Sequence, residues 1–249
     1  MRKNGPVVNK IRTEPHTEPL YARVRAELVR GLSSGELTPG MALPAENVLA
    51  REMSVSVGTV RKAVDSLVAE GVLTRHQGKG TFVTEQTPER ANFHFFRVVD
   101  SEGARVLPET LREGVTLRPA GNQAARRLKL EPGVPVVRIE RVRAIGGRPS
   151  ILEVIDVPAD LMPGLETESP LPNALYPHYQ ADHGVSVVST EDRLSAVVAK
   201  PKTSKALCVP EGSPLLRADR VALDLTGNPV EWRRSWFLTD DLAYAVTLG

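Results

Sequence analysis

The stretch LPAENVLAREMSVSVGTVRKAVDSLVAEGVLTRHQGKGTFV, residues 43–83, carries an ordered series of secondary-structure signals. Pro44 suits the first turn of a helix, because its fixed φ matches the helical value. The SVS sequence interrupts that helix. Ser56 then has the type and position of an N-cap whose hydroxyl accepts from the backbone N–H of Gly58 or Thr59. Apolar residues return beyond it at helical spacing, so the pattern predicts a second helix after a short turn.

A glycine-centred hairpin is predicted after the second helix. Gly71 has the place of a residue that ends a helix in the left-handed conformation. VLTRH and GTFVT then have the pattern of two strands, joined by a turn that contains Gln77, Gly78 and Lys79. Two helices joined by a tight turn and followed by such a hairpin are typical of a winged helix-turn-helix. This part of the chain is therefore predicted to bind DNA.

Residues 19–83, which begin PLYARVRAELVRGLSSGELTPGM and continue into the stretch above, resemble the DNA-binding domain of GntR-family transcription regulators. Thr59, Arg61 and Lys62 lie off the apolar stripe of the second helix, where a recognition helix meets base edges and phosphates. The resemblance implies a homodimer that grips double-stranded operator DNA with two such helices. The residues expected to contact DNA are Asn47, Ser56, Val57, Thr59, Arg61, Lys62, Gln77, Gly78 and Lys79.

Two residues depart from the usual pattern of this family. Most relatives have arginine after the LPxE motif and after the capping serine, where this chain has Asn47 and Val57. Because an arginine fork is the usual reader of guanine, these departures argue against a standard operator sequence. Val57 could instead touch a thymine methyl. The alternative is that both residues belong to the surface or the packing, and that Arg61 and the wing supply mostly phosphate contacts.

The length of the chain, 249 residues with 41% hydrophobic content, suits two domains. We expect a flexible tail at 1–17, the winged helix-turn-helix at 18–84, a linker at 85–92 and an effector-binding domain at 93–249. Residues 1–84 hold 12 Lys and Arg against 8 Asp and Glu, and the remainder holds 20 against 22. The positive excess therefore lies in the predicted DNA-binding part.

Nothing in the sequence predicts export, a membrane span or a metal site. No apolar run approaches the roughly 18 residues of a membrane span, so we expect a cytoplasmic protein with no membrane partner. Cys208 is the single cysteine, which excludes an internal disulfide and a cysteine-based zinc site. His178 and His183 are five residues apart, a spacing that places them poorly on one helical face. We therefore expect neither a metal nor another cofactor.

The second part of the chain contains an internal repeat. LEPGVPVVRIERV from Leu130 and VPEGSPLLRADRV from Val209 align at a shift of 79 residues, which pairs Arg141 with Arg220. Each copy then passes through a glycine turn into a strand headed by proline. Two such units predict an α+β fold with one antiparallel, pseudo-twofold sheet, flanking helices and a pocket between the halves. Strands are predicted near 93–99, 134–144, 150–157, 185–199, 215–225 and 230–237, and helices near 123–130, 175–181 and 203–208.

This second part resembles the UTRA effector domain of the histidine-utilisation-repressor branch of the GntR family, whose fold is related to chorismate lyase. VPVVRIERVRAIGGRPSILEV and VPEGSPLLRADRVALDLTGNPVEW carry the resemblance, which extends from about Phe93 to the C-terminus. Family members that sense sugar phosphates use two arginines of an RxR strand and two glutamates on later strands. The matching positions here are Arg141, Arg143, Glu153 and Glu231.

The chemistry of these residues suits an anion. Arg141 and Arg143 would project from one face of a strand, so both guanidinium groups could converge on a phosphate or carboxylate. We add Arg97, because FHFFR places a cation among aromatic residues near the expected pocket entrance. The alternative is that these charges form surface ion pairs on an exposed sheet face. The residues expected to bind the ligand are Arg97, Arg141, Arg143, Glu153, Tyr176, Glu231 and Phe237.

Two further departures bear on the ligand. Ala174 stands where relatives often have serine, and Phe237 where many have tyrosine, so the expected pocket has fewer hydroxyls. A small carboxylic acid is therefore favoured over an amino-sugar phosphate. The sequence as a whole predicts a ligand-responsive, sequence-specific DNA-binding repressor that a small anionic metabolite releases. The alternatives are a lyase-like enzyme in the C-terminal domain, for which no catalytic residues stand out, and an effector-independent DNA-binding protein.

Overall fold

The computed structural model describes residues 18–246, apart from the side chains of residues 92–94. The chain divides between Gln86 and Thr87 into two compact units. The tail predicted at residues 1–17 lies outside the described residues. No helix in the described part of the chain combines the length and the apolar character that a membrane span needs.

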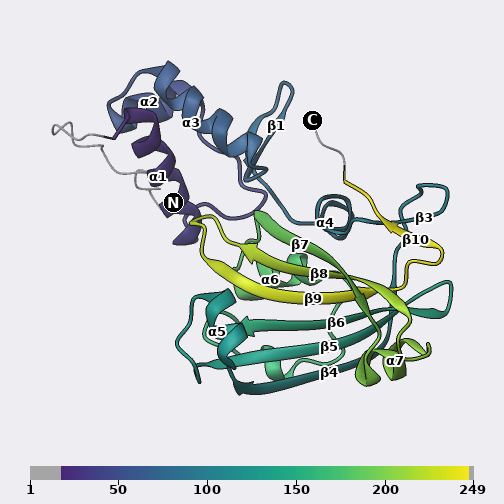
Figure 1. The fold of residues 1–249 in the computed structure, drawn as a ribbon. Coiled ribbons are helices and arrows are strands. Elements are labelled where there is room, and N and C mark those ends of the chain that lie inside the picture. Colours follow the sequence, from purple (N-terminus) through teal and green to yellow (C-terminus); the bar gives the residue numbers. More distant parts are fainter. Residues whose placement is uncertain (1–17, 247–249) are drawn as a thin grey trace. The chain divides into compact units, whose positions relative to one another are not determined.

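The first unit contains three helices and a two-stranded hairpin (Figure 1). Its elements are α1 (Leu20–Ser33), α2 (Glu46–Met53), α3 (Val57–Ala69), β1 (Leu73–His76) and β2 (Gly80–Val83). α3 packs against both α1 and α2, and the two strands pair antiparallel. The order of elements predicted from the sequence is confirmed.

Local sequence explains where these elements begin and end. The Ser56 hydroxyl accepts from the backbone N–H of Thr59 at 3.1 Å, so the predicted cap of α3 is confirmed. α2 begins later than predicted, at Glu46 with Ala45 as its N-cap. Gly71 follows α3 with a φ of +72°, a left-handed conformation that favours glycine. The core is formed by buried apolar residues of the three helices and the hairpin, among them Val24, Leu28, Leu49, Val60, Leu67 and Leu73.

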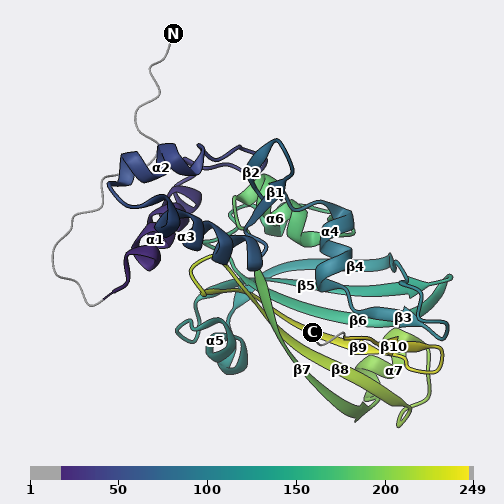
Figure 2. The same cartoon turned by 90° about the horizontal axis from the view of Figure 1, so that it is seen from above.

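The second unit is built on a six-stranded antiparallel sheet with the order β4-β5-β6-β9-β8-β7 (Figure 2). The strands are β4 (Glu109–Pro119), β5 (Pro135–Ile145), β6 (Arg148–Pro158), β7 (Ser189–Val198), β8 (Pro214–Leu223) and β9 (Pro229–Phe237). A separate pair joins β3 (Val98–Asp100) to β10 (Leu242–Tyr244). The helices are α4 (Pro88–Phe95), α5 (Asn122–Leu128), η1 (Leu165–Thr167), α6 (Leu175–His183) and α7 (Pro201–Leu207).

The two faces of this sheet are covered by different helices. On one face α5 packs with Val136 and Trp232. α7 packs on the same face with Val142 and Leu152. On the other face η1 and α6 pack against strand residues that include Ile139 and Ile155. Because both faces are covered, nearly every residue of β6 is buried.

The internal repeat is visible in the fold. α5 and α7 occupy equivalent positions 79 residues apart, and each ends at a residue in the left-handed conformation, Lys129 with φ 54° and Cys208 with φ 56°. The strand order is symmetric about the junction of β6 and β9, so β4, β5 and β6 correspond to β7, β8 and β9. The predicted pseudo-twofold sheet is confirmed.

Some elements of the second unit differ from the sequence prediction. Residues 88–95, which were expected to be linker and strand, form helix α4, so Arg97 lies before β3 and not within a strand. The strand predicted from 185 begins at Ser189. β4 was not predicted, because this edge strand is largely exposed and Glu113 interrupts the alternating apolar positions Leu111, Val115 and Leu117.

Candidate functional site

The first unit has a surface groove of about 490 Å³ formed by α2, α3 and the hairpin. Asn47 of α2, Val57 and Arg61 of α3, and Lys79 of the hairpin turn all line it. Val57 keeps 39% of its surface exposed. The three elements that the sequence predicted to contact DNA therefore present side chains to one concave surface.

The other residues predicted to contact DNA have more varied surroundings. Gln77 and Gly78 are exposed at the tip of the hairpin. The hydroxyls of Ser56 and Thr59 lie 2.8 Å apart and bind each other, so both belong to the helix cap. The Lys62 ammonium lies 4.1 Å from the centre of the Tyr21 ring, which holds it against α1.

Arg61 is held in an exposed ion-pair network. Its Nε donates to Glu46 at 2.9 Å, and Glu46 also accepts from Arg75 at 3.0 Å. Arg75 in turn contacts Asp65 at 2.6 Å. Exposed ion pairs of this kind are worth little, about 0–1 kcal/mol. Arg61 can therefore exchange Glu46 for a phosphate or a base edge at small cost.

The second unit carries a band of charged residues across all six strands. Strand register places them on the sheet face that α6 covers, with Glu113 beside Arg141, Arg141 beside Glu153, and Arg220 beside both Arg233 and Asp192. We call the following residues the charged band: Glu113, Arg141, Arg143, Glu153, Asp192, Arg220, Glu231 and Arg233. With four arginines and four carboxylates it is balanced in charge, and most of its members are buried.

Two small adjoining cavities, of about 50 and 20 Å³, lie against this band. Arg220 and Arg233 line both of them, and Arg143 lines the larger. The smaller one is also lined by Arg97 and Glu153. The walls of the larger cavity thus present three arginines and no carboxylate among the described residues, while the balancing carboxylates lie behind them.

Arg141 and Glu231 lie behind the cavity walls. Arg141 is fully buried, with Nε donating to Glu113 at 2.7 Å and Nη2 donating to the carbonyl of Pro172 at 2.9 Å. Glu231 is fully buried as well and accepts from the hydroxyls of Tyr176 and Tyr179, each at 3.0 Å. Both residues are thus satisfied by the protein itself. They fit a role in positioning the site better than direct contact with a ligand.

Arg143 has both protein partners and a free donor. Nη1 donates to Glu153 at 3.0 Å, and Nη2 donates to the Asn173 side chain at 2.6 Å and to the Pro108 carbonyl at 3.1 Å. Its Nε is buried and has no hydrogen-bond partner among the described residues. Burial lowers the pKa of Arg143. An anion that accepted from Nε would satisfy this donor and stabilise the charge.

The remaining predicted residues lie on the cavity walls. Tyr176 and Ala174 line the larger cavity, and Arg97 and Phe237 line the smaller. The two positions where this chain lacks a hydroxyl, Ala174 and Phe237, therefore both face the space that a ligand would enter. Tyr244 adds a hydroxyl to the smaller cavity that the sequence did not predict, bound to Arg220 at 3.2 Å.

Comparison with known proteins agrees with both units. Residues 20–83 match the family described as "Bacterial regulatory proteins, gntR family", and residues 108–243 match the UTRA domain. The chain is 31% identical over 217 residues to the HTH-type transcriptional regulator YurK of Bacillus subtilis, covering 85% of this chain and 88% of that protein. It belongs to the GntR family. Its second unit is a UTRA domain, and the protein is a transcription regulator rather than an enzyme.

Other relatives and solved structures support this assignment. The mannosyl-D-glycerate transport/metabolism system repressor MngR of Escherichia coli is 28% identical, covering 92% of this chain and 95% of that protein. The ligand-binding domain of a GntR-family regulator from Bordetella bronchiseptica is 31% identical with a TM-score of 0.56, covering 63% of this chain and 98% of that chain. PhnF from Mycobacterium smegmatis, at 24% identity with a TM-score of 0.53 and coverage of 91% and 99%, shows the same fold.

Sequence reasoning missed two arginines of the UTRA cavity, Arg220 and Arg233. The internal repeat held the signal for Arg220, because it pairs this residue with Arg141. The structure shows the same arrangement in both halves, with Arg141 bound to Glu113 of the outer strand and Arg220 bound to Asp192 at 2.7 and 3.0 Å. Arg233 had no such signal. It binds Glu231 at 2.9 Å through two nitrogens and Glu153 at 3.2 Å.

The ionisation of Glu153 makes the stability of the UTRA domain change with pH in the acid range. Burial alone would raise its pKa, but the charges of Arg233, Arg143 and Arg141 outweigh burial and hold the pKa at about 2, against an ordinary value of 4.5. Because the pKa of Glu153 is lowered in the folded state, its carboxylate stabilises the folded domain fully above about pH 4.5. This stabilisation is lost as the pH falls toward 2. This shift corresponds to about 3 kcal/mol.

We expect the free energy of unfolding of the wild type to fall more steeply between pH 4.5 and 2 than that of Glu153→Gln, which cannot titrate there. Denaturant unfolding at several pH values, followed by tryptophan fluorescence, measures this difference. Parallel pH curves for the two proteins would show that Glu153 does not have the low pKa.

Proposed function

We propose that this regulator is a homodimeric repressor that leaves its operator when the UTRA domain binds a small anion. The observation that carries the proposal is the arginine-lined wall formed by Arg143, Arg220 and Arg233 in a domain that follows directly after a winged helix-turn-helix. The repressor names of relatives such as MngR support the direction of control. Because the target is DNA, we place the protein in the cytoplasm.

The DNA-binding half of the proposal rests on the groove between α2, α3 and the hairpin. Arg61 and Asn47 would face base edges or phosphates, Val57 would face the groove floor of the duplex, and Lys79 would bind a phosphate from the wing. One winged helix reads one half-site. Two copies related by a twofold axis would therefore read a near-palindromic operator.

The effector half of the proposal rests on the charge of the cavity walls and on the volume of the cavities. Three arginines on one wall favour a phosphate or carboxylate. The loss of hydroxyls at Ala174 and Phe237 favours a small carboxylate over a hydroxyl-rich sugar phosphate. The cavities of about 50 and 20 Å³ have room for only a few water molecules, since each water needs roughly 10–15 Å³. A metabolite therefore has to widen the site.

Helix α4 is the element best placed to respond to this widening. Ala91 and Phe95 of α4, with Phe96 after it, line the larger cavity, and Phe95 packs edge-on against Tyr176 at 4.9 Å between ring centres. α4 is also the first element after the DNA-binding domain. An effector that displaced Phe95 would move the segment that tethers the winged helix. By linkage, it must then bind the free protein more tightly than the DNA-bound protein.

Arg143→Gln is expected to abolish the response to the effector while leaving DNA affinity without effector unchanged. A thermal-shift screen of small carboxylates and phosphate monoesters on the wild type identifies the anion to use, since saturation at 100 times Kd stabilises by about 2.7 kcal/mol. Arg118→Gln, an exposed arginine of β4, is the control for charge loss. A normal thermal shift and normal operator release in Arg143→Gln would contradict the proposed site.

A further inference from the structure

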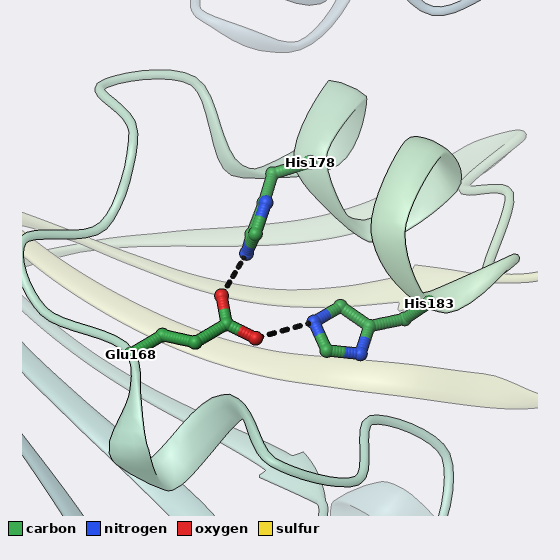
Figure 3. Close-up of side chains that lie close together, drawn as sticks. All are labelled: Glu168, His178 and His183. Carbon is green, nitrogen blue, oxygen red and sulfur yellow. Dashed lines mark ion pairs between the residues drawn. The ribbon is translucent and has the colours of Figure 1, made fainter.

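A second polar cluster lies away from the charged band, at the end of α6. Glu168, from the loop after η1, places its carboxylate between the rings of His178 and His183 (Figure 3). Its two oxygens lie 2.7 Å from His178 Nε2 and 3.3 Å from His183 Nε2. The five-residue spacing does not separate the two rings, whose centres are 5.3 Å apart, because His183 is the last residue of the helix.

The two histidines are buried but incompletely satisfied. Their side chains are 9% and 5% exposed, and neither Nε2 has a hydrogen-bond partner among the described residues. The Glu168 oxygens face both nitrogens at ion-pair distance. Imidazole nitrogens and carboxylate oxygens are zinc ligands, so a small outward movement of Glu168 would let one cation bind all three residues.

His178 has a second carboxylate on the other side of its ring. His178 Nδ1 lies 2.7 Å from the Asp182 carboxylate, one helical turn away. With a proton on Nδ1 donated to Asp182, the ring would present the lone pair of Nε2 toward Glu168. A carboxylate behind a histidine in this way is the usual outer partner of a metal-ligating imidazole, where it orients the ring and raises its basicity.

We propose that Glu168, His178 and His183 bind a divalent transition-metal ion such as Zn²⁺. One ligand atom from each residue lies within 4.8 Å of the others. A tetrahedral zinc ion with bonds of about 2.0–2.1 Å needs ligand atoms about 3.3 Å apart. Glu168, on a half-exposed loop, can adjust to that spacing, and water fills the fourth position. The ion would fasten the C-terminal end of α6, the helix that carries Tyr176 and Tyr179 to Glu231.

The test is a zinc titration of the chelator-treated full-length protein against a chromophoric indicator. We expect one equivalent per chain, a rise in melting temperature, and a visible Co²⁺ spectrum of tetrahedral type. Glu168→Gln should lose most of the binding without threatening the fold, because the residue is half-exposed. Asp182→Asn should weaken binding about 10- to 100-fold. His76→Ala, at the exposed wing, should bind normally.

Two results would overturn the proposal. One is the absence of binding at micromolar zinc, which would leave the cluster as an ion-pair network. The other is unchanged stoichiometry and affinity in both Glu168→Gln and a His178→Gln/His183→Gln variant whose circular dichroism is native. In that case the metal would bind elsewhere in the chain.

Discussion

Replacing Arg233 by methionine is expected to lower the free energy of unfolding of the UTRA domain by about 3–5 kcal/mol. Arg233 binds two buried carboxylates, Glu153 and Glu231, which have exposures of 3% and 0%. Removing the cation leaves both buried carboxylates without their main cationic partner. Methionine keeps the apolar stem of the side chain but lacks the guanidinium group, so the lost charge and hydrogen bonds account for most of the effect.

Tryptophan fluorescence measures this change in one domain alone. The chain has two tryptophans, Trp232 and Trp236, and both lie in β9 of the UTRA domain. Arg148→Met is the matched control, because Arg148 also contacts two carboxylates, Asp240 and Asp241, but at the surface. It should cost about 0–1 kcal/mol. Equal costs for the two variants would show that the charged band does not depend on Arg233.

Arg61→Ala is expected to weaken operator binding by about 1–3 kcal/mol, or roughly 5- to 150-fold. Arg61 lines the groove with Asn47 and Lys79, and the exposed pair with Glu46 holds it only weakly. Fluorescence anisotropy at fixed salt, with a duplex selected from random sequence by the wild type, measures the loss. The stability of the protein should hardly change.

Arg25→Ala is the matched control for Arg61. Arg25 pairs with Glu70, which caps the C-terminal end of α3, about 14 Å along the helix from Arg61. The Arg25→Ala variant loses the same charge as Arg61→Ala, but beside the C-terminal end of α3. It should leave operator affinity within about twofold of the wild type. If both variants bound the operator like the wild type, the groove would not be the DNA-binding surface.

Local signals made the first domain predictable from sequence. The cap at Ser56, the apolar spacing of α3 and the glycines of the hairpin each act within a few residues, so their outcome does not depend on distant parts of the chain. α4 was missed although it has local start signals: the Thr87 hydroxyl accepts from the backbone N–H of Arg90, and Pro88 is the first helical residue. The helix is short, and Phe95 at its end packs on Tyr176, about 80 residues later.

The sequence predicted only part of the candidate effector site, and it missed Arg220 although the internal repeat pairs this residue with Arg141. Arg141 and Arg143 came from the family resemblance, and their surroundings show that the first is enclosed by Glu113 while the second faces the cavity. The sequence could not make this distinction, since burial depends on β4, an unpredicted strand. The partnership of Glu168 with His178 is equally a product of the fold, because the residues come from separate elements.

Selection of duplex DNA by the full-length protein, followed by titration, tests whether this regulator is a sequence-specific, dimeric DNA-binding protein. We expect a two-fold symmetric sequence to emerge and to bind about 1,000-fold or more tightly than a shuffled duplex of the same composition at physiological salt. We also expect affinity to fall steeply with salt for both duplexes. Equal affinity for the selected and shuffled duplexes would contradict sequence-specific binding.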